Sequence, residues 1–529
     1  MTIEAPVRYW SRHIPEGAWD YIVIGSGMGG MTSAALLSKL GKRVLVIEQH
    51  VIPGGFTQTF KRPGYHWDVG VHLVGEMTGR SYLGRLLANL TDGRLEWASV
   101  GDIYDEFNFP DGFTIQFPNS KSAFRDTLYE YFPKEHKAIG DYFDLVKAAS
   151  RSASGYMQAR VAPAVLAPGA KKKSALAAMP HIQATTAEVL ANLTDDAHLR
   201  AVLAAQWGYY GSTPAKSSFA MHALMVAHFL WGAYYPVGSA SSIAREMLRT
   251  VADAGGWTAI RTEVEEVIVR GGRATGVRLK DGRELHASRV ISAAGVPVTS
   301  DLLPDGSLPT SPDIAASPAH VSLYLGFEGD IANNGGSRYS QWFYETWDME
   351  RDLWHIRSGE RPARADVLYC SFPSLKDPSH DPGPEMRHTG EIITFVPWGS
   401  YEKWLGSRWK KRDPEYDEFK TSVSEALLDQ YLEHYPDLKP MVKFSELSTP
   451  LSTHHFARSH RGSIYGLASE PDRFINEELV PKTSIKGFYM AGVDVMAPGI
   501  AGAIGGGALA VAAAEPIAAL RYLRPIMKG

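Results

Sequence analysis

Cysteine is almost absent, since Cys370 is the one cysteine among 529 residues. A lone cysteine excludes a disulfide within the chain and leaves no cysteine cluster for zinc, so we expect no metal. A dominant charge of one sign is also lacking, because 54 basic residues accompany 58 acidic ones for a net charge of −4. Without a basic excess, nothing predicts nucleic-acid binding.

Long uninterrupted apolar runs are missing as well. Charged residues interrupt the apolar positions of residues 1–20, which therefore predict neither a signal peptide nor an anchor. The apolar stretches 219–231 and 508–514 are too short or too interrupted to span a bilayer, so we expect a cytoplasmic protein. With 44% hydrophobic and 21% charged residues, a chain of 529 residues suits a globular protein of two or three domains. The oligomeric state is left open.

What the chain does contain is a glycine-rich turn between a strand and a helix. The β-formers of 21–24 lead into the turn, and residues 31–40 suit a helix closed by Gly41. Such glycines permit a tight turn, let the backbone approach a pyrophosphate and let the helix pack on the strand. The helix N-terminus then points free N–H groups at phosphate. The predicted phosphate-binding residues are Gly25, Ser26, Gly27, Met28, Gly29 and Gly30.

An acidic residue follows at the spacing that a dinucleotide site requires. The apolar strand 44–47 ends at Glu48, about 20 residues after the first glycine, where an acid accepts hydrogen bonds from a ribose hydroxyl. The turn at Gly54 and Gly55 is the extension seen in FAD proteins of the glutathione-reductase type. We therefore predict an α/β fold with a Rossmann-like FAD-binding domain. Glu48, Gln49, Gly54 and Gly55 join the predicted FAD contacts.

Residues 23–60 and 64–77 together resemble the opening of the all-trans-retinol 13,14-reductase (retinol saturase) family. This family is a branch of the phytoene desaturase and carotenoid isomerase superfamily. Further matches are Gly211–Pro214, Ser218–Leu224 and Tyr235–Gly238, although Ser239 stands where the family usually has a second glycine. The resemblance covers most of the chain and becomes weak between 300 and 450.

The C-terminal region provides a second candidate cofactor segment. A strand at 488–491 leads to Asp494, which can accept hydrogen bonds from ribityl hydroxyls. The following helix N-terminus can stabilise negative charge on the flavin N1–C2=O edge, although a glycine-rich helix packed for close approach would look the same. In the resembling family, the segment containing Val71 runs beneath the flavin and Val264 lies against the adenine. These regions add Val71, Val264, Ala294, Gly295, Gly492, Asp494, Gly499, Ile500 and Ala501 to the predicted FAD contacts.

The resemblance implies that two domains are each split along the chain. Residues 18–80, 235–300 and 480–529 are expected to form the FAD-binding domain. Residues 81–234 and 301–479 are expected to form a substrate-binding domain around a mixed sheet. The apolar pattern predicts a hairpin at 104–117, strands at 258–269, 274–279, 287–294, 321–327 and 391–396, and a helix at 414–434.

Three residues are candidates for the proton donor of an alkene reduction. Such a reduction moves a hydride between flavin N5 and one alkene carbon, and it needs a proton on the neighbouring carbon. We rank His72, Tyr235 and His222 in that order, although His72 could equally be a structural histidine. His454 and His455 are adjacent, point apart on any regular element and do not predict a metal site.

Two further segments bear on the substrate. The aromatic-rich, nearly uncharged residues 201–242 suit a deep apolar pocket, although an ordinary core helix would look the same. Within 151–190, three lysines at 171–173 follow the largely apolar residues 161–168. This segment is either a solvated linker or helical cap, or a lid or membrane-facing lip that admits a lipid.

These observations predict an FAD-dependent oxidoreductase that holds FAD non-covalently and acts on CH–CH or C=C bonds of an apolar polyene or lipid. The resemblance favours saturation over phytoene-type desaturation and cis–trans isomerisation of a polyene or fatty acid. The electrons would come from NAD(P)H or another external donor. Animal members of the family are membrane-associated, which implies a peripheral membrane contact. A non-enzymatic lipid escort of the GDP-dissociation-inhibitor kind is disfavoured by Glu48 and the C-terminal segment.

Overall fold

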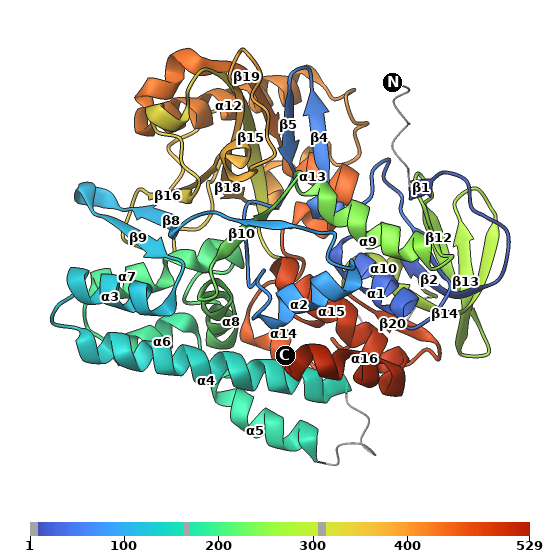
Figure 1. Cartoon of the computed structure of the whole chain (residues 1–529). Helices are drawn as coiled ribbons and strands as arrows, with labels where there is room; N and C mark the ends of the chain where they lie inside the picture. Colours follow the sequence, from blue (N-terminus) through green and yellow to red (C-terminus); the bar gives the residue numbers. More distant parts are fainter. Residues whose placement is uncertain (1–8, 162–168, 305–313, 529) are drawn as a thin grey trace.

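Two large sheets dominate the protein, whose computed structural model describes residues 9–161, 169–304 and 314–528 (Figure 1). The first sheet has eight strands in the order β1-β11-β3-β2-β14-β13-β12, and β20 also pairs with β14. Its strands are β1 (Trp10–Ser11), β2 (Trp19–Ile24), β3 (Val44–Ile47), β11 (Trp257–Ala259), β12 (Val264–Arg270), β13 (Arg273–Leu279), β14 (Glu284–Ser292) and β20 (Phe488–Met490). Strands from the start, middle and end of the chain therefore meet in one sheet.

Alternating side chains of β2 bury both faces of this sheet. Tyr21 and Val23 belong to the core under a helical layer, whereas Ile22 and Ile24 belong to a second core on the opposite face. This two-sided burial explains why the strand has a continuous apolar sequence. The helical layer comprises α1 (Met28–Lys39), α2 (Tyr82–Leu90), α9 (Ser241–Asp253), α15 (Gly499–Ala514) and α16 (Pro516–Lys528).

The expected single strand at 258–269 is wrong, because the chain forms two strands there. β11 pairs in parallel with β3, whereas β12 pairs with β13 in an antiparallel manner. Between them Arg261 adopts a left-handed φ of 53° and Thr262 donates its N–H to the carbonyl of Glu48. This turn takes the chain past the end of β3 to Val264, the first residue of β12.

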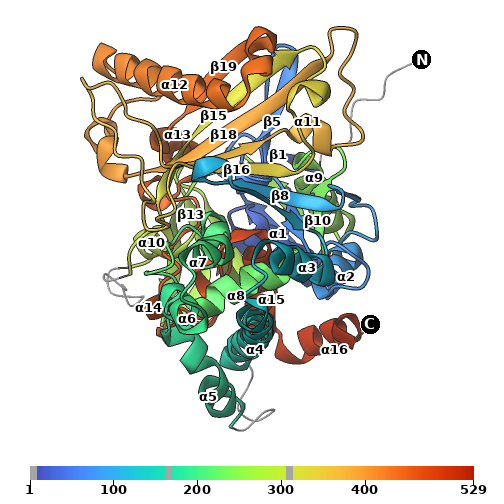
Figure 2. The same ribbon diagram turned by 90° about the vertical axis from the view of Figure 1, so that its left-hand side faces the viewer.

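The second sheet confirms the expected mixed architecture. It has seven strands in the order β19-β15-β18-β17-β16-β8-β9, and within it β16 and β8 are parallel. α12 (Pro414–His434) covers one face, as Figure 2 shows. The strands are β8 (Ile103–Asn108), β9 (Thr114–Pro118), β15 (Ala319–Glu328), β16 (Ser340–Tyr344), β17 (Val367–Ser371), β18 (Arg387–Val396) and β19 (Val442–Ser448).

A group of helices packs beside the seven-stranded sheet around the largest apolar core. These helices are α3 (Lys121–Tyr131), α4 (His136–Val161), α5 (Ala170–Gln183), α6 (Thr186–Leu193), α7 (Ala197–Ala204) and α8 (Phe219–Phe229). Within the described residues, no helix combines the length and apolar character needed to cross a bilayer.

Smaller elements connect the two large sheets. β4 (Thr59–Arg62) and β5 (Tyr65–Asp68) form a ribbon, and the indole of Trp67 donates to the carbonyl of Leu325 on β15 at 2.9 Å. β6 (Val74–Gly75), β7 (Trp97–Ser99) and β10 (Ala233–Pro236) form a three-stranded sheet. Short helices are α10 (Val296–Asp301), α11 (Pro373–Lys376), α13 (Pro450–Ala457) and α14 (Pro471–Ile475).

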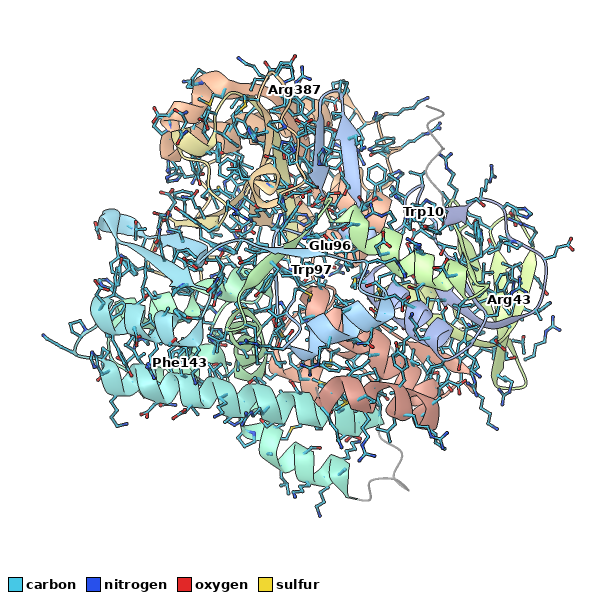
Figure 3. All side chains as sticks on the ribbon, in the orientation of Figure 1. Trp10, Arg43, Glu96, Trp97, Phe143 and Arg387 are labelled. Carbon is cyan, nitrogen blue, oxygen red and sulfur yellow. The ribbon has the colours of Figure 1, made fainter. Side chains whose placement is uncertain are left out.

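Arg43, labelled in Figure 3, contacts the start of β2 and the turn before β11 in the eight-stranded sheet. Its guanidinium lies 4.1 Å from the ring centroid of Trp19, and its Nε donates to the carbonyl of Gly255 at 3.0 Å. The backbone N–H of Arg43 donates to Asp20. Arg43, the residue before β3, thus links the start of β2 and the turn before β11.

Candidate cofactor and substrate site

One continuous cavity of about 540 Å³ extends from the glycine turn before α1 to the inner face of the seven-stranded sheet. Both large sheets contribute to its walls. This size lies within the range of about 300–1,000 Å³ that is usual for ligand pockets. The cavity has a polar, glycine-lined half and an aromatic half.

The four glycines of the first turn have different geometric roles. Gly25 has a φ of +91°, which favours glycine, whereas a Cβ on Gly27 would meet no atom within 4 Å. A Cβ on Gly30 would lie 2.1 Å from the carbonyl oxygen of Gly25, and one on Gly29 would lie 2.5 Å from the Cα of Gly492. Gly27 therefore leaves room for a ligand, while Gly29 and Gly30 allow close backbone packing.

Glu48 is held at the cavity wall by a network of donors. Its Oε2 accepts from the N–H of Ser26 at 2.9 Å and from the Ser26 hydroxyl at 2.6 Å, and its Oε1 accepts from the N–H of His50 at 2.7 Å. The Ser26 hydroxyl in turn accepts from the N–H of Gly54. Because the acid is buried and orientated, its free lone pairs are available to hydroxyl groups in the cavity.

The C-terminal segment supplies the other polar wall. Asp494 is buried, and its two oxygens accept from the N–H groups of Val296 at 2.8 Å and Leu467 at 3.0 Å. The first residues of α15, Gly499 and Ile500, line the cavity, and a Cβ on Gly499 would meet no atom within 4 Å. Further along α15, a Cβ on Gly507 would lie 2.5 Å from the carbonyl oxygen of Gly29. The helix therefore combines an open N-terminus with close packing on α1.

Most of the predicted cofactor residues meet at this cavity. The lining includes Gly25, Gly27, Met28, Gly29, Glu48, Gln49, Gly54, Gly55, Val264, Ala294, Gly295, Gly492, Asp494, Gly499 and Ile500. The other four are outside the lining, and two of them, Ser26 and Gly30, contact residues that line it. Ser26 holds Glu48, Gly30 packs against Gly25, and Val71 is buried in the core under the helical layer. Ala501 packs against that same core.

The aromatic half comes mainly from the region where the resemblance is weak. Its lining includes Tyr209, Trp342, Val367, Tyr369, Ile393, Phe395 and Tyr465. Sequence reasoning missed these residues except as part of the 201–242 block. The available signal was the alternation on β18, where Ile393 and Phe395 share a face, but strand periodicity alone does not show what a face contacts.

His72 lies at the aromatic half and is a cavity-lining residue. Its side chain is 13% exposed, and its Nδ1 is 3.4 Å from Oε2 of Glu391. The ammonium of Lys376 donates to the backbone carbonyl of His72 at 3.0 Å. Burial and the positive charge of Lys376 lower the pKa of His72 to about 3, so the imidazole is neutral near pH 7.

Tyr235 and His222 occupy enclosed positions outside the cavity lining of the described chain. Tyr235 is buried and donates its hydroxyl to Asp68. His222 is fully buried, with Nε2 2.8 Å from the Tyr142 hydroxyl and Nδ1 3.2 Å from the Tyr210 hydroxyl. Both ring nitrogens thus have protein partners, which fits a structural histidine.

Ser239 adopts the left-handed backbone that a glycine would favour, with a φ of 72°. Its N–H donates to Asp377 at 2.9 Å, and the N–H of the preceding Gly238 donates to the same carboxylate. This turn therefore binds a side chain of the protein.

The segment 151–190 forms the end of α4, α5 and the start of α6 in its described part. Lys171, Lys172 and Lys173 are exposed on the first turn of α5, and Leu176 is 71% exposed. The apolar residues 162–168 lie outside the described residues. A lid or membrane-facing role for this segment stays a prediction.

Asp105 on β8 provides a test of the buried electrostatics beside the aromatic half. Its Oδ1 accepts from the Tyr209 hydroxyl at 2.7 Å, and burial raises its pKa to about 7, with Lys376 as an opposing positive charge. Between about pH 4 and pH 7 the folded state therefore keeps a proton that the unfolded state has lost, and the stability that this group contributes falls as pH rises.

We expect Asp105→Asn to remove this pH dependence. The unfolding free energy of the wild type minus that of the variant should therefore decrease from pH 5 to pH 8. Urea unfolding of both proteins at the two pH values checks this, with exposed Asp195→Asn as the control. A difference that is constant with pH would contradict a raised pKa at Asp105.

Comparisons with known proteins agree with this geometry. The family described as an NAD(P)-binding Rossmann-like domain matches residues 23–90. A protein named all-trans-retinol 13,14-reductase from Danio rerio is 30% identical over 525 residues, covering 94% of this chain and 86% of that protein. Prolycopene isomerase 1 from an Oncidium hybrid cultivar is 25% identical and covers 91% of this chain and 81% of its own.

Among solved structures, an oxidoreductase from Methanosarcina mazei has a TM-score of 0.62 at 15% identity. The match covers 92% of this chain and 98% of that one. At this identity the likeness concerns the fold alone. It confirms the expected architecture of a Rossmann-like domain joined to a mixed sheet.

Proposed function

Because the chain belongs to the all-trans-retinol 13,14-reductase family, we propose that it binds FAD non-covalently and saturates a carbon–carbon double bond of an apolar polyene or lipid. The chain is an oxidoreductase with a site for a flavin or nucleotide cofactor. Retinoids, carotenoids and unsaturated fatty acyl chains are the candidate substrates. The electrons come from an external donor such as NAD(P)H.

The residues at the polar half fit FAD. Gly27, Gly492 and Gly499 leave open space where a side chain would project, which suits close approach of a pyrophosphate and a flavin. Glu48 is placed to accept from ribose hydroxyls and Asp494 from ribityl hydroxyls. The N-terminus of α15 is placed to stabilise negative charge on the flavin N1–C2=O edge. A bound flavin supplies a centre that exchanges a hydride with a carbon atom.

The observation that carries the proposal is the continuity of the cavity. The cofactor half opens directly onto an apolar wall that includes Trp342, Ile393 and Phe395. A polyene lying along this wall would meet the cofactor without crossing water, and water exclusion suits hydride transfer. His72, at the same wall, is placed to provide the proton for the second carbon.

The first test is whether the purified protein is a flavoprotein. We expect flavin absorbance near about 450 nm, released by heat or acid because FAD is not covalently attached. Protein that stays colourless after incubation with FAD would contradict the proposal and favour a lipid-binding escort.

The second test is the substrate half-reaction. The flavin is photoreduced without oxygen, and retinol, a carotenoid and an unsaturated fatty acid are added separately. Reoxidation by one of them, with a product two hydrogens heavier, is the expected result. A product of unchanged mass would indicate isomerisation, and a product formed only from oxidised flavin would indicate desaturation; either would overturn saturation.

A further inference from the structure

A row of polar residues crosses the seven-stranded sheet directly beside the aromatic wall. In the strand register Glu391 pairs with Tyr324 on one side and Ser371 on the other, and Ser340 pairs with Asp105. The neighbouring row, two residues along each strand, includes Ile393, Tyr369 and Trp342 and lines the cavity. The carboxyl groups of Glu391 and Asp105 are thus buried two residues along their strands from the row that lines the cavity.

The side chain of Lys376 contacts both this row and the backbone of His72. Its ammonium donates to the hydroxyls of Ser340 at 2.9 Å and Ser371 at 2.8 Å and to the backbone carbonyl of His72. All three N–H bonds of the ammonium therefore have acceptors. Lys376 thus links the His72 backbone to the sheet. Burial lowers the pKa of Lys376 to about 7, and a negative charge on Glu391 or Asp105 favours its protonated form.

Glu391 lies on β18 beside His72. Its side chain is completely buried, and neither carboxyl oxygen has a hydrogen-bond partner among the described residues. Nδ1 of His72 also lacks one, although it is 3.4 Å from Oε2 of Glu391. This distance is longer than a typical hydrogen bond, and such contacts often shorten when a ligand binds. A buried, unsatisfied pair of this kind calls for a functional explanation.

The chemistry of a neutral imidazole supplies a functional explanation for this pair. A neutral ring can release the proton on Nε2 without becoming an anion only if Nδ1 accepts a proton in the same step. Nδ1 is the buried ring nitrogen that faces Glu391. The exposed area of the His72 side chain therefore belongs to its other atoms. Burial raises the pKa of Glu391 well above its ordinary value, which favours the protonated carboxyl group.

We propose that Glu391 is a proton relay residue that acts through His72. The O–H bond of Glu391 breaks as a proton passes to Nδ1, and the Nε2–H bond breaks as that proton passes to an alkene carbon. A reduced flavin bound in the cavity would supply the hydride, with its two electrons, to the adjacent carbon. Glu391 is left as a carboxylate beside the charge of Lys376, and the alkene gains two hydrogens. This relay rests on the proposed function.

A rival relay lies on the same wall. Tyr209 lines the cavity and donates its hydroxyl to Asp105, so a phenol backed by a carboxyl group could also supply a proton. The geometry favours Glu391, because the Tyr209 hydroxyl already points to an acceptor. Tyr209→Phe separates these routes experimentally.

The test compares Glu391→Gln with Glu446→Gln in the photoreduced holoenzyme. Glu446 is a matched control, because it pairs with Tyr324 in the same sheet row but lies on the edge strand β19 in an ion pair with Arg62. We expect Glu391→Gln to slow reoxidation by the substrate by about tenfold to about a thousandfold. This effect is smaller than the full contribution of a general acid, about a hundredfold to about ten-thousandfold, because Glu391 acts through His72. Flavin binding and photoreduction should be unchanged, and Glu446→Gln should match the wild type.

Solvent deuterium distinguishes proton relay from a structural effect. If proton transfer limits the variant, the ratio of reoxidation rates in H2O and D2O should be larger for Glu391→Gln than for the wild type. Glu391→Asp, which keeps the acid, should recover part of the rate. A wild-type rate in Glu391→Gln, or a slower rate with an unchanged isotope ratio, would overturn the relay.

The outcomes also separate the relay from the reaction. If the wild type is reoxidised with a reduced product but Tyr209→Phe alone loses activity, the relay through Glu391 is wrong and the proposed function stands. If no polyene or lipid reoxidises the wild-type flavin, the proposed function fails and the relay fails with it.

Discussion

Replacing Gly27 with alanine is expected to leave the free protein folded and to weaken FAD binding, whereas replacing Gly30 with alanine is expected to destabilise the protein itself. A Cβ on Gly27 would meet no protein atom within 4 Å and would project where a pyrophosphate is expected. A Cβ on Gly30 would lie 2.1 Å from the carbonyl oxygen of Gly25. The two variants add the same methyl group three residues apart.

The expected magnitudes follow from overpacking. Forcing a methyl group into a filled space costs about 1–3 kcal/mol, so Gly30→Ala should lower the unfolding free energy of the apoprotein by at least this amount. The same cost at the cofactor surface weakens binding by about tenfold to about a hundredfold in Gly27→Ala. Urea unfolding of the apoproteins and titration with FAD measure the two effects. Wild-type FAD affinity in Gly27→Ala would exclude the pyrophosphate role of this turn.

The cofactor half was predictable because its determinants are local. The geometry of the turn, the position of Glu48 at the end of β3 and the helix after Asp494 each depend on a few consecutive residues. Backbone sterics require glycine in the turn. The length of a strand, a helix and a second strand sets the position of the acid. Motifs of a few residues each thus predicted cavity-lining positions in two segments that lie more than 400 residues apart in the chain.

The aromatic half was not predictable because its determinants are non-local. Ile393 and Phe395 face the cavity only because β18 pairs with β15 and β17 in one register, and a shift by one residue would turn both away. Glu391 begins the predicted strand 391–396, and the burial of its side chain cannot be predicted until the register of that strand is known. His72 and His222 illustrate the same limit, since each follows a similar apolar context and only one lines the cavity.

Replacing His72 with alanine is expected to slow the reduction of the substrate by about a hundredfold to about ten-thousandfold, the usual contribution of a general acid. His72 lines the aromatic half of the cavity, and its side chain contacts Glu391 and Tyr369 of the seven-stranded sheet, so FAD affinity should change little. The space left by the ring is at the cavity wall, so added imidazole should restore part of the rate. The measurement is the rate at which substrate reoxidises the photoreduced flavin, with and without imidazole.

His222→Phe provides the contrasting variant, because it removes the hydrogen-bond partner of the buried Tyr142 hydroxyl and one of the partners of the Tyr210 hydroxyl. An unsatisfied buried hydroxyl costs about 1–3 kcal/mol, so this variant should be clearly less stable, yet its turnover per bound flavin should resemble the wild type. Urea unfolding and flavin-normalised rates distinguish the two histidines. Unchanged turnover in His72→Ala would remove His72 as the proton donor, and a large loss of turnover in folded His222→Phe would assign that role to His222 instead.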